Sequence, residues 1–331
     1  MGDSLSPILG EIIAASLGNE PPRSQLERVN YVENILGSQG YKNSSLRNAS
    51  PTRYDKGRAL AAYSELSKTG GINQLDQFWA RDIARQLLRL EHAPDFFTSE
   101  GQHKMEASNR ASGGLLKSYV MHLAAANMSG YEVCPGASRG CRKSCLVTSG
   151  HGSTCGVTAG RIKRTRLLVE HKEIFALTLY GLLKNISTRK HAAAIRLNGT
   201  SDIAWEKKEP WIFKLFPEIQ FYDYTKLHGR FKPGLPSNYH LTFSRSEDER
   251  NQKQGLKLLE RGYNVAMVFE YPLYQAIVRT GSWQGYPAID GAADDRRFLD
   301  APGIVALKAL GQGKQDSSGF VIRNSLNILK G

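Results

Sequence analysis

Seven short runs of β-forming residues, separated by helical segments, constrain the fold of this chain more than any other feature. They begin near residue 115 and read SYVMHLA, AAAIRLNG, IQFYDYT, YHLTFS, NVAMVFE, YPAID and GIVAL. Strands that alternate with helices are typical of right-handed βα units, which build a parallel sheet. A closed barrel of this kind needs about eight strands. We therefore predict an α/β fold, a partial (β/α) barrel of about six parallel strands over residues 115–331.

The first part of the chain has a different pattern. Ser24 and Glu27 have the spacing of a helix capping box, and apolar residues follow them at helical intervals. A second apolar stripe runs from Leu75 to Leu90. We predict a helical N-terminal domain or cap over residues 1–100, with the stretch HAPDFFTSEGQ as its exit linker. A further capping box, Ser246 with Glu249, is predicted to start a helix in the core.

Polar side chains follow four consecutive predicted strands of the core. Because the carboxyl ends of parallel strands lie at one edge of a sheet, these side chains should converge on a pocket. Helix capping is the alternative explanation for about half of them. The residues are Asn198, Thr200, Ser201, Asp202, Asp223, Thr225, Lys226, Ser244, Arg245 and Glu270.

Two roles are assigned within this set. Asn198, Asp202, Asp223 and Lys226 are the candidate catalytic residues, and Asp202 or Asp223 would handle the proton if burial raises its pKa. The candidate cofactor-binding residues are Asn198, Thr200, Ser201 and Ser244.

All four cysteines lie in one segment, CPGASRGCRKSCLVTSGHGSTC, at residues 134–155. No secretory signal is visible, so we expect a cytoplasmic, reducing environment in which disulfides are disfavoured. Clustered thiols then indicate one metal centre, with Cys134, Cys141, Cys145 and Cys155 as ligands. Such sites hold zinc or an iron–sulfur cluster. Only Cys141 and Cys145 have the close spacing of a zinc knuckle, which favours a [4Fe–4S] cluster, with zinc as the alternative.

The chain carries a net charge of +13, which favours polyanionic partners such as nucleic acid. No run of residues is apolar and long enough for a membrane helix, and nothing indicates an oligomeric state. Part of the charge forms a strip near the cysteines that either contacts phosphates or is a solvated helix face that balances thiolate charge. The strip comprises Arg139, Arg142, Lys143, Arg161, Lys163, Arg164 and Arg166.

Five blocks, CPGASRGCRKSCL, RLNGTSDIAWE, FPEIQFYDYTK, NYHLTFSRSE and DSSGFVIR, resemble in order the blocks of the gene product 88 family. The resemblance covers about residues 115–325. It implies a protein of a family encoded largely by phages and other mobile elements, with a cysteine-bearing core and a poorly characterised activity. For a phage protein, the cytoplasm would be that of the host.

The layout is also similar, more distantly, to radical SAM enzymes, which have a cysteine loop after the first strand of a βα series. That similarity implies S-adenosylmethionine as a cofactor. Cys141 and Cys145 match the first half of the C-x₃-C-x₂-C hallmark, but Thr148 stands at its third position. Cys155 would have to supply that thiolate, and a fourth ligand at Cys134 would close every iron.

Three hypotheses about function follow. The first is an iron–sulfur enzyme that acts on a phosphate-bearing or nucleic-acid-related substrate. The second is a zinc-stabilised protein that binds nucleic acid without catalysis. The third is a factor that binds a host protein through its helical N-terminal portion.

Overall fold

The structure is a computed structural model that describes residues 96–98, 109–110, 112–113, 115–170 and 172–323. The helices predicted before residue 95 lie outside these residues. The described residues belong to two compact units: residues 167–185 belong to one, and the remainder to the other. The larger unit carries the sheet and every candidate site residue.

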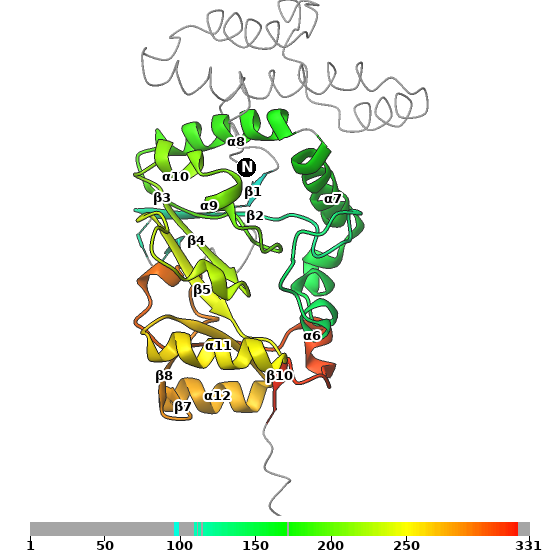
Figure 1. Ribbon diagram of the computed structural model, residues 1–331, viewed down its shortest axis with the longest axis vertical. Coiled ribbons are helices and arrows are strands. Elements are labelled where there is room, and N and C mark those ends of the chain that lie inside the picture. The colour runs from blue at the N-terminus through cyan, green and yellow to red at the C-terminus, as the bar shows by residue number, and fades with distance from the viewer. Residues whose placement is uncertain (1–95, 99–108, 111, 114, 171, 324–331) are drawn as a thin grey trace, which may run out of the picture. The chain divides into compact units, whose positions relative to one another are not determined.

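A sheet of ten strands organises the larger unit (Figure 1). The strand order is β1-β2-β3-β4-β5-β6-β9-β8-β7, and β10 pairs with β6. Strands β1 and β7 pair antiparallel with their neighbours, and the other pairs are parallel. The strands are β1 (Phe97–Thr98), β2 (Leu116–Met121), β3 (Ala192–Arg196), β4 (Gln220–Thr225), β5 (Tyr239–Ser244), β6 (Val265–Phe269), β7 (Ser282–Trp283), β8 (Tyr286–Asp290), β9 (Ile304–Lys308) and β10 (Val321–Ile322).

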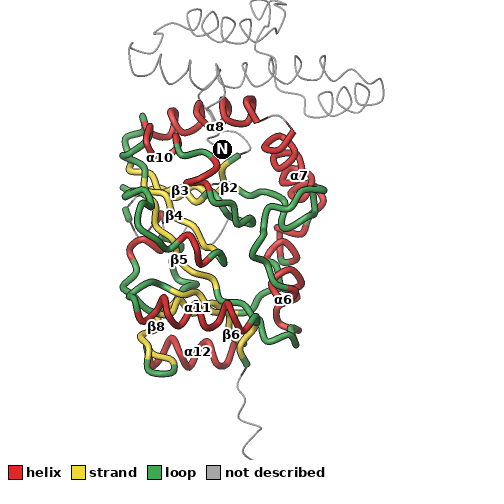
Figure 2. The backbone as a smooth tube through the Cα atoms, viewed as in Figure 1, coloured by secondary structure: helices red, strands yellow, loops and turns green. Residues whose placement is uncertain are grey.

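Helices and strands alternate along the core, as Figure 2 shows. The mixed α/β class and the mostly parallel sheet are therefore confirmed. The sheet is not closed, so the barrel is not confirmed. The described helices are α6 (Arg139–Lys143), α7 (Cys155–Glu170), α8 (Lys172–Ser187), α9 (Trp205–Lys208), α10 (Trp211–Leu215), α11 (Glu249–Glu260) and α12 (Tyr271–Thr280), with 3-10 turns η2 (Leu146–Thr148), η3 (Gly150–Ser153), η4 (His228–Arg230), η5 (Arg297–Leu299) and η6 (Gly311–Gln315).

The predicted capping box of α11 is wrong by two residues. Asp248 is the N-cap, and its side chain accepts a hydrogen bond from Asn251 N–H at 2.9 Å. Ser246 instead donates its N–H to Asn251 Oδ1 at 2.7 Å. Asp248 and Ser246 are both good caps, so composition alone did not identify the first helical residue.

Part of the predicted exit linker is a strand. Phe96 and Phe97 are buried, and Phe97 pairs with Met121 on the free edge of β2. Its ring also meets Tyr119 edge to face at 6.5 Å. Burying the two phenyl rings stabilises the folded state. This free energy favours pairing with β2 over an exposed linker.

One face of the sheet is apolar. In-register neighbours on parallel strands point to the same side, and Phe221 of β4 pairs with Tyr239 of β5. Phe213 of α10 packs on both, with ring centroids 5.0 Å from Phe221 and 4.5 Å from Tyr239. Gly255 of α11 lies close to Phe243, so close that a Cβ there would be 3.3 Å from the ring. Helices α10 and α11 therefore cover this face.

The opposite face is polar over β2, β3, β4 and β5. Several residues that alternate with the apolar set carry hydroxyl, imidazole or guanidinium groups, although Val120 and Ala194 also lie on this side. The polar residues are Ser118, Arg196, Tyr222, Tyr224, His240 and Thr242. We call this surface the polar face.

None of the helices that the structure describes is long and apolar enough to cross a membrane.

Candidate functional site

The cysteine loop lies against the carboxyl ends of β3 and β4. Asp202 donates its N–H to the carbonyl oxygen of Val133 at 2.8 Å. A Cβ on Gly136 would lie 3.0 Å from Lys226 Cβ and 3.6 Å from Asp202 Oδ2. The loop therefore occupies the strand-end position that was predicted for it, and a side chain at position 136 would be tightly packed against Lys226.

Glu247 fixes the middle of the loop. Its carboxylate accepts hydrogen bonds from the Ser138 hydroxyl at 2.6 Å and from Gly140 N–H at 2.7 Å. Ser138 is the N-cap of α6, and Gly140 lies in its first turn, where backbone N–H groups lack helical partners. A Cβ on Gly140 would lie 2.2 Å from Ser318 Oγ, so α6 is also pressed against the segment before β10. Sequence reasoning missed Glu247 as a site residue, although it ends the NYHLTFSRSE block.

Three of the four thiols lie close enough together to influence one another. Burial, together with the charges of Cys145, Asp202 and Cys141, raises the pKa of Cys134 to about 12, against the opposing effect of the hydrogen bond from Ala126 N–H. Burial also raises the pKa of Cys145, with an added contribution from Cys141.

The sulfur of Cys134 also has backbone partners. It accepts from Ala126 N–H at 3.3 Å, and its S–H donates to the Thr200 carbonyl oxygen at 3.6 Å. Cys155, the first residue of α7, is exposed. Within the described residues, no three His, Cys, Asp or Glu side chains are close enough to hold a metal ion. Metal binding would therefore require the thiols to move toward one another.

Asp223 and Asn198 form a buried network at the ends of β3 and β4. The Asp223 carboxylate accepts from Asn198 N–H at 2.7 Å, from Asn198 Nδ2 at 3.0 Å and from the Tyr239 hydroxyl at 2.6 Å. Burial raises the pKa of Asp223 to about 7, against the opposing effect of these donors and of Arg230. Asn198 Oδ1 accepts from the Ser201 hydroxyl at 2.8 Å. The network ties the residues after β3 to the interior of β4 and to the first residue of β5, and a catalytic role for Asp223 stays a prediction.

Arg230, in the turn after β4, is a central residue that sequence reasoning missed. It is 2% exposed and donates to Glu206 at 2.9 and 3.1 Å, to Asp202 Oδ1 at 3.3 Å and to the Tyr239 hydroxyl at 2.8 Å. Asp202 Oδ2 in turn accepts the N–H of Lys226 at 2.8 Å. Arg230 thus sets the position of Asp202 beside the cysteine loop. A single arginine in a polar turn gives no sequence signal of burial.

Lys226 and Ser244 meet at the same edge. Lys226 Nζ donates to Ser244 Oγ at 2.6 Å and lies 5.5 Å from the ring centroid of Phe320. The structure thus brings together two of the predicted residues, one directly after β4 and one at the end of β5. The Thr200 hydroxyl donates to the carbonyl oxygen of Leu123, a bond between loops.

The basic strip does not act as one surface. Arg161 is buried and donates to the Gly152 carbonyl oxygen at 2.8 Å, and its charge acts on Cys145. Arg164 donates to the His122 carbonyl oxygen at 2.8 Å, and Arg142 forms an ion pair with Glu132 at 2.7 Å. Lys163 is half-buried, and the exposed members besides Arg142 are Arg139, Lys143 and Arg166.

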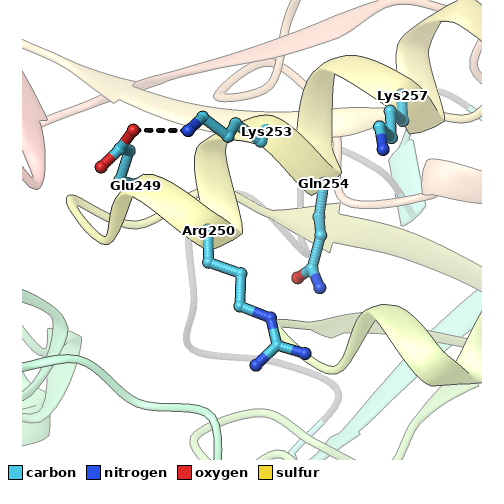
Figure 3. Close-up of a pocket in the computed structure, with 5 residues that line it drawn as sticks. All are labelled: Glu249, Arg250, Lys253, Gln254 and Lys257. Atoms are coloured by element: carbon cyan, nitrogen blue, oxygen red, sulfur yellow. Dashed lines mark hydrogen bonds and ion pairs between the residues drawn. The ribbon is translucent and has the colours of Figure 1, made fainter.

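A shallow hollow of about 420 Å³ lies along the outer side of α11, away from these residues in sequence. Figure 3 shows its lining, Glu249, Arg250, Lys253, Gln254 and Lys257, with Lys253 turned toward Glu249. That ion pair measures 2.5 Å, and its side chains are 69% and 81% exposed. The hollow is an ordinary solvated helix face, and it contains none of the predicted site residues.

Residues 85–324 match the family model described as gene product 88. The chain belongs to the gene product 88 family. The match spans every described strand, all four cysteines and both residues that sequence reasoning missed. No curated protein and no solved structure matches the chain, and the comparisons give no support to the radical SAM layout. Membership of the gene product 88 family thus identifies the core without assigning its chemistry.

Proposed function

We propose that this gene product 88 protein is an iron–sulfur enzyme that acts on a phosphate-bearing or nucleic-acid-related substrate. Cys134, Cys141 and Cys145 would hold a [4Fe–4S] cluster. The observation that carries the proposal is that neighbouring thiols of the loop raise the pKa of Cys134 and of Cys145 while the loop contacts Asp202 and Lys226. Metal at this position would adjoin polar strand ends, where parallel α/β folds bind ligands.

The surroundings of the thiols suit a thiolate-bound cluster. Thiolates and cluster sulfides carry negative charge, and the charges of Arg161 and Lys226 both favour the ionised form of Cys145. The N–H of Ala126 already donates to the Cys134 sulfur, a type of bond that tunes cluster potential. Cys155 remains the candidate for a fourth ligand. With three thiolates, a bound cluster would keep one iron open to substrate or to S-adenosylmethionine.

The protein side chains would bind and orient the substrate. Lys226, anchored by Ser244, would pair with an anionic substrate group. Asp202 would be held in place by Arg230. Asp223 is the candidate proton-handling group because its pKa of about 7 lies near neutral pH. A partial-barrel arrangement would place these groups on one rim.

We also propose that the protein is located in the host cytoplasm, where thiols stay reduced.

The second candidate function is a nucleic-acid-binding protein in which zinc only folds the loop. Its support is that Arg139 and Lys143 are exposed on the same short helix as Cys141. In that case neither labile sulfide nor turnover would be present, and binding to DNA would weaken steeply with added salt.

Anaerobic purification with analysis of iron, labile sulfide and zinc separates the two functions. We expect iron and sulfide together, with absorption near ~400 nm from the cluster. Single Cys134→Ser, Cys141→Ser and Cys145→Ser variants should lose metal, and Cys155→Ser, at the exposed cysteine, tests whether Cys155 is the fourth ligand. Zinc without sulfide would favour the second function. Full metal content in all four variants would contradict both proposed functions, because each requires cysteine ligands.

A further inference from the structure

The polar face contains buried groups that no described residue satisfies. The hydroxyls of Tyr224 and Thr242 and the Nε of Arg196 are enclosed and have no hydrogen-bond partner among the described residues. Tyr224 and Thr242 are cross-strand neighbours, and the Arg196 guanidinium lies 4.5 Å from the centroid of the Tyr224 ring. Thr242 is fully buried. Buried polar groups are nearly always hydrogen-bonded, so this cluster indicates a missing partner.

Positive charge gathers beside the cluster. Arg161 and Arg164 from α7 join Arg196 from β3 in lowering the pKa of His122, which burial lowers most, to about 3. The imidazole is therefore neutral near pH 7. Asp295 offsets part of the charge, since it pairs with Arg196 at 3.4 Å. The Nε of Arg161, like that of Arg196, is enclosed without a partner among the described residues.

Donors exceed acceptors in this arrangement. Two guanidinium N–H groups and two hydroxyls can donate, and the ring nitrogens His122 Nδ1 and His240 Nε2 add two further buried polar atoms. The charges of three guanidinium groups act on His122 against that of Asp295, and Asp223 also acts on Arg196. A bound water could satisfy single groups but would leave the positive charge in place. An oxyanion would satisfy several donors at once and would also neutralise charge in a poorly hydrated site.

We propose that the polar face binds the phosphate or carboxylate group of a small molecule through Arg196, Tyr224 and Thr242. Arg161 and Arg164 supply the surrounding positive field. Arg196, Tyr224 and Thr242 are not among the residues assigned above to metal or to catalysis, and the inference does not rest on the metal centre.

Binding of inorganic phosphate to the full-length protein tests the inference. Calorimetric titration gives the affinity, and thermal unfolding is compared in sodium phosphate, sodium acetate and sodium chloride at equal ionic strength. We expect phosphate or acetate to raise the unfolding midpoint above that in chloride. A response to phosphate identifies a phosphate ligand, and one to acetate a carboxylate.

The two hydroxyls give a paired signature. Tyr224→Phe and Thr242→Val should each weaken binding of the stabilising anion about tenfold, because each removes a hydrogen bond to a charged group. In chloride the same variants should unfold at the same temperature as the unsubstituted protein or higher, because an unsatisfied hydroxyl is gone. Tyr271→Phe, at a 55% exposed tyrosine, should change neither quantity.

Two results would overturn the inference. One is equal unfolding midpoints in phosphate, acetate and chloride. The other is unchanged anion affinity in both variants with a lower midpoint in chloride, which would mean that the hydroxyls only hold buried water. Metal content of the same preparations is measured separately, so failure here and failure of the iron–sulfur proposal remain distinguishable.

Discussion

Replacing Arg230 with methionine should destabilise the larger unit by about 3–5 kcal/mol, the usual result of removing one partner from a buried ion pair. The Arg230 side chain is 1% exposed, and the side chains of Asp202 and Glu206 are each 10% exposed. Methionine retains much of the apolar volume but none of the donors. Two carboxylates would then remain nearly buried with no counter-charge.

The geometry indicates which partner accounts for most of the loss. Glu206 receives two bonds from Arg230, at 2.9 and 3.1 Å, whereas Asp202 receives one at 3.3 Å and keeps its bond from Lys226 N–H. Glu206→Gln in the Arg230→Met background removes the more isolated charge. We expect this double variant to regain about 1–3 kcal/mol relative to Arg230→Met alone.

Urea unfolding followed by tryptophan fluorescence is a suitable assay because Trp205 and Trp211 are both buried in this unit. Lys253→Met is the matched control, since Lys253 pairs with Glu249 on the solvated face of α11. Its loss should be no more than about 0.5 kcal/mol. An Arg230→Met protein within about 1 kcal/mol of the unsubstituted protein, with no gain from Glu206→Gln, would refute the reasoning.

Three further predictions concern the loop and the strand ends. Glu247→Ala should expose the cysteine loop to proteolysis and reduce metal retention at least severalfold, whereas Glu249→Ala should do neither. Gly136→Ala places a Cβ 3.0 Å from Lys226 Cβ and should likewise reduce metal retention, while Gly229→Ala, with nothing within 4 Å of its Cβ, should not. The folded-state pKa of Asp223, about 7, lies above the ordinary value of 3.8 for this carboxyl, so the native state binds the extra proton and stability should fall as pH rises from about 4 to about 7. Asp223→Asn should flatten that slope in urea titrations across this range. An unchanged slope would contradict the assignment.

Local pattern was enough to find the main strands. All seven predicted runs are strands, and most of them contain the aromatic and β-branched residues that are typical of buried parallel strands, although β3 is mainly alanine. Strand β10 could not be found this way. It has two residues and pairs with Val268 and Phe269 of β6, beyond the point where β5 leaves that edge. Its existence depends on free space along β6, which no local pattern encodes.

The candidate site also has a part that could be predicted from the sequence and a part that could not. The loop position followed from topology alone, because a segment after the first parallel strand must emerge at the carboxyl edge. The polar face could not be predicted from topology. Tyr224 and Thr242 are good strand formers in any environment, so their presence in strands does not indicate a binding surface. Only their register identifies them as neighbours with unsatisfied hydroxyls. The burial of Arg230 was equally hidden, because it depends on carboxylates that different loops bring together.

The two candidate sites share one boundary. Ser244 follows Thr242 by two residues on β5, so it points to the same side of the sheet and lies about 7 Å farther along the strand. Ser244 holds Lys226, whose charge acts on Cys145. A small molecule with its oxyanion at Tyr224 and Thr242 would therefore extend toward Lys226 and the thiols. On this geometry the polar face would select and orient the substrate, and the cysteine loop would supply the reacting end.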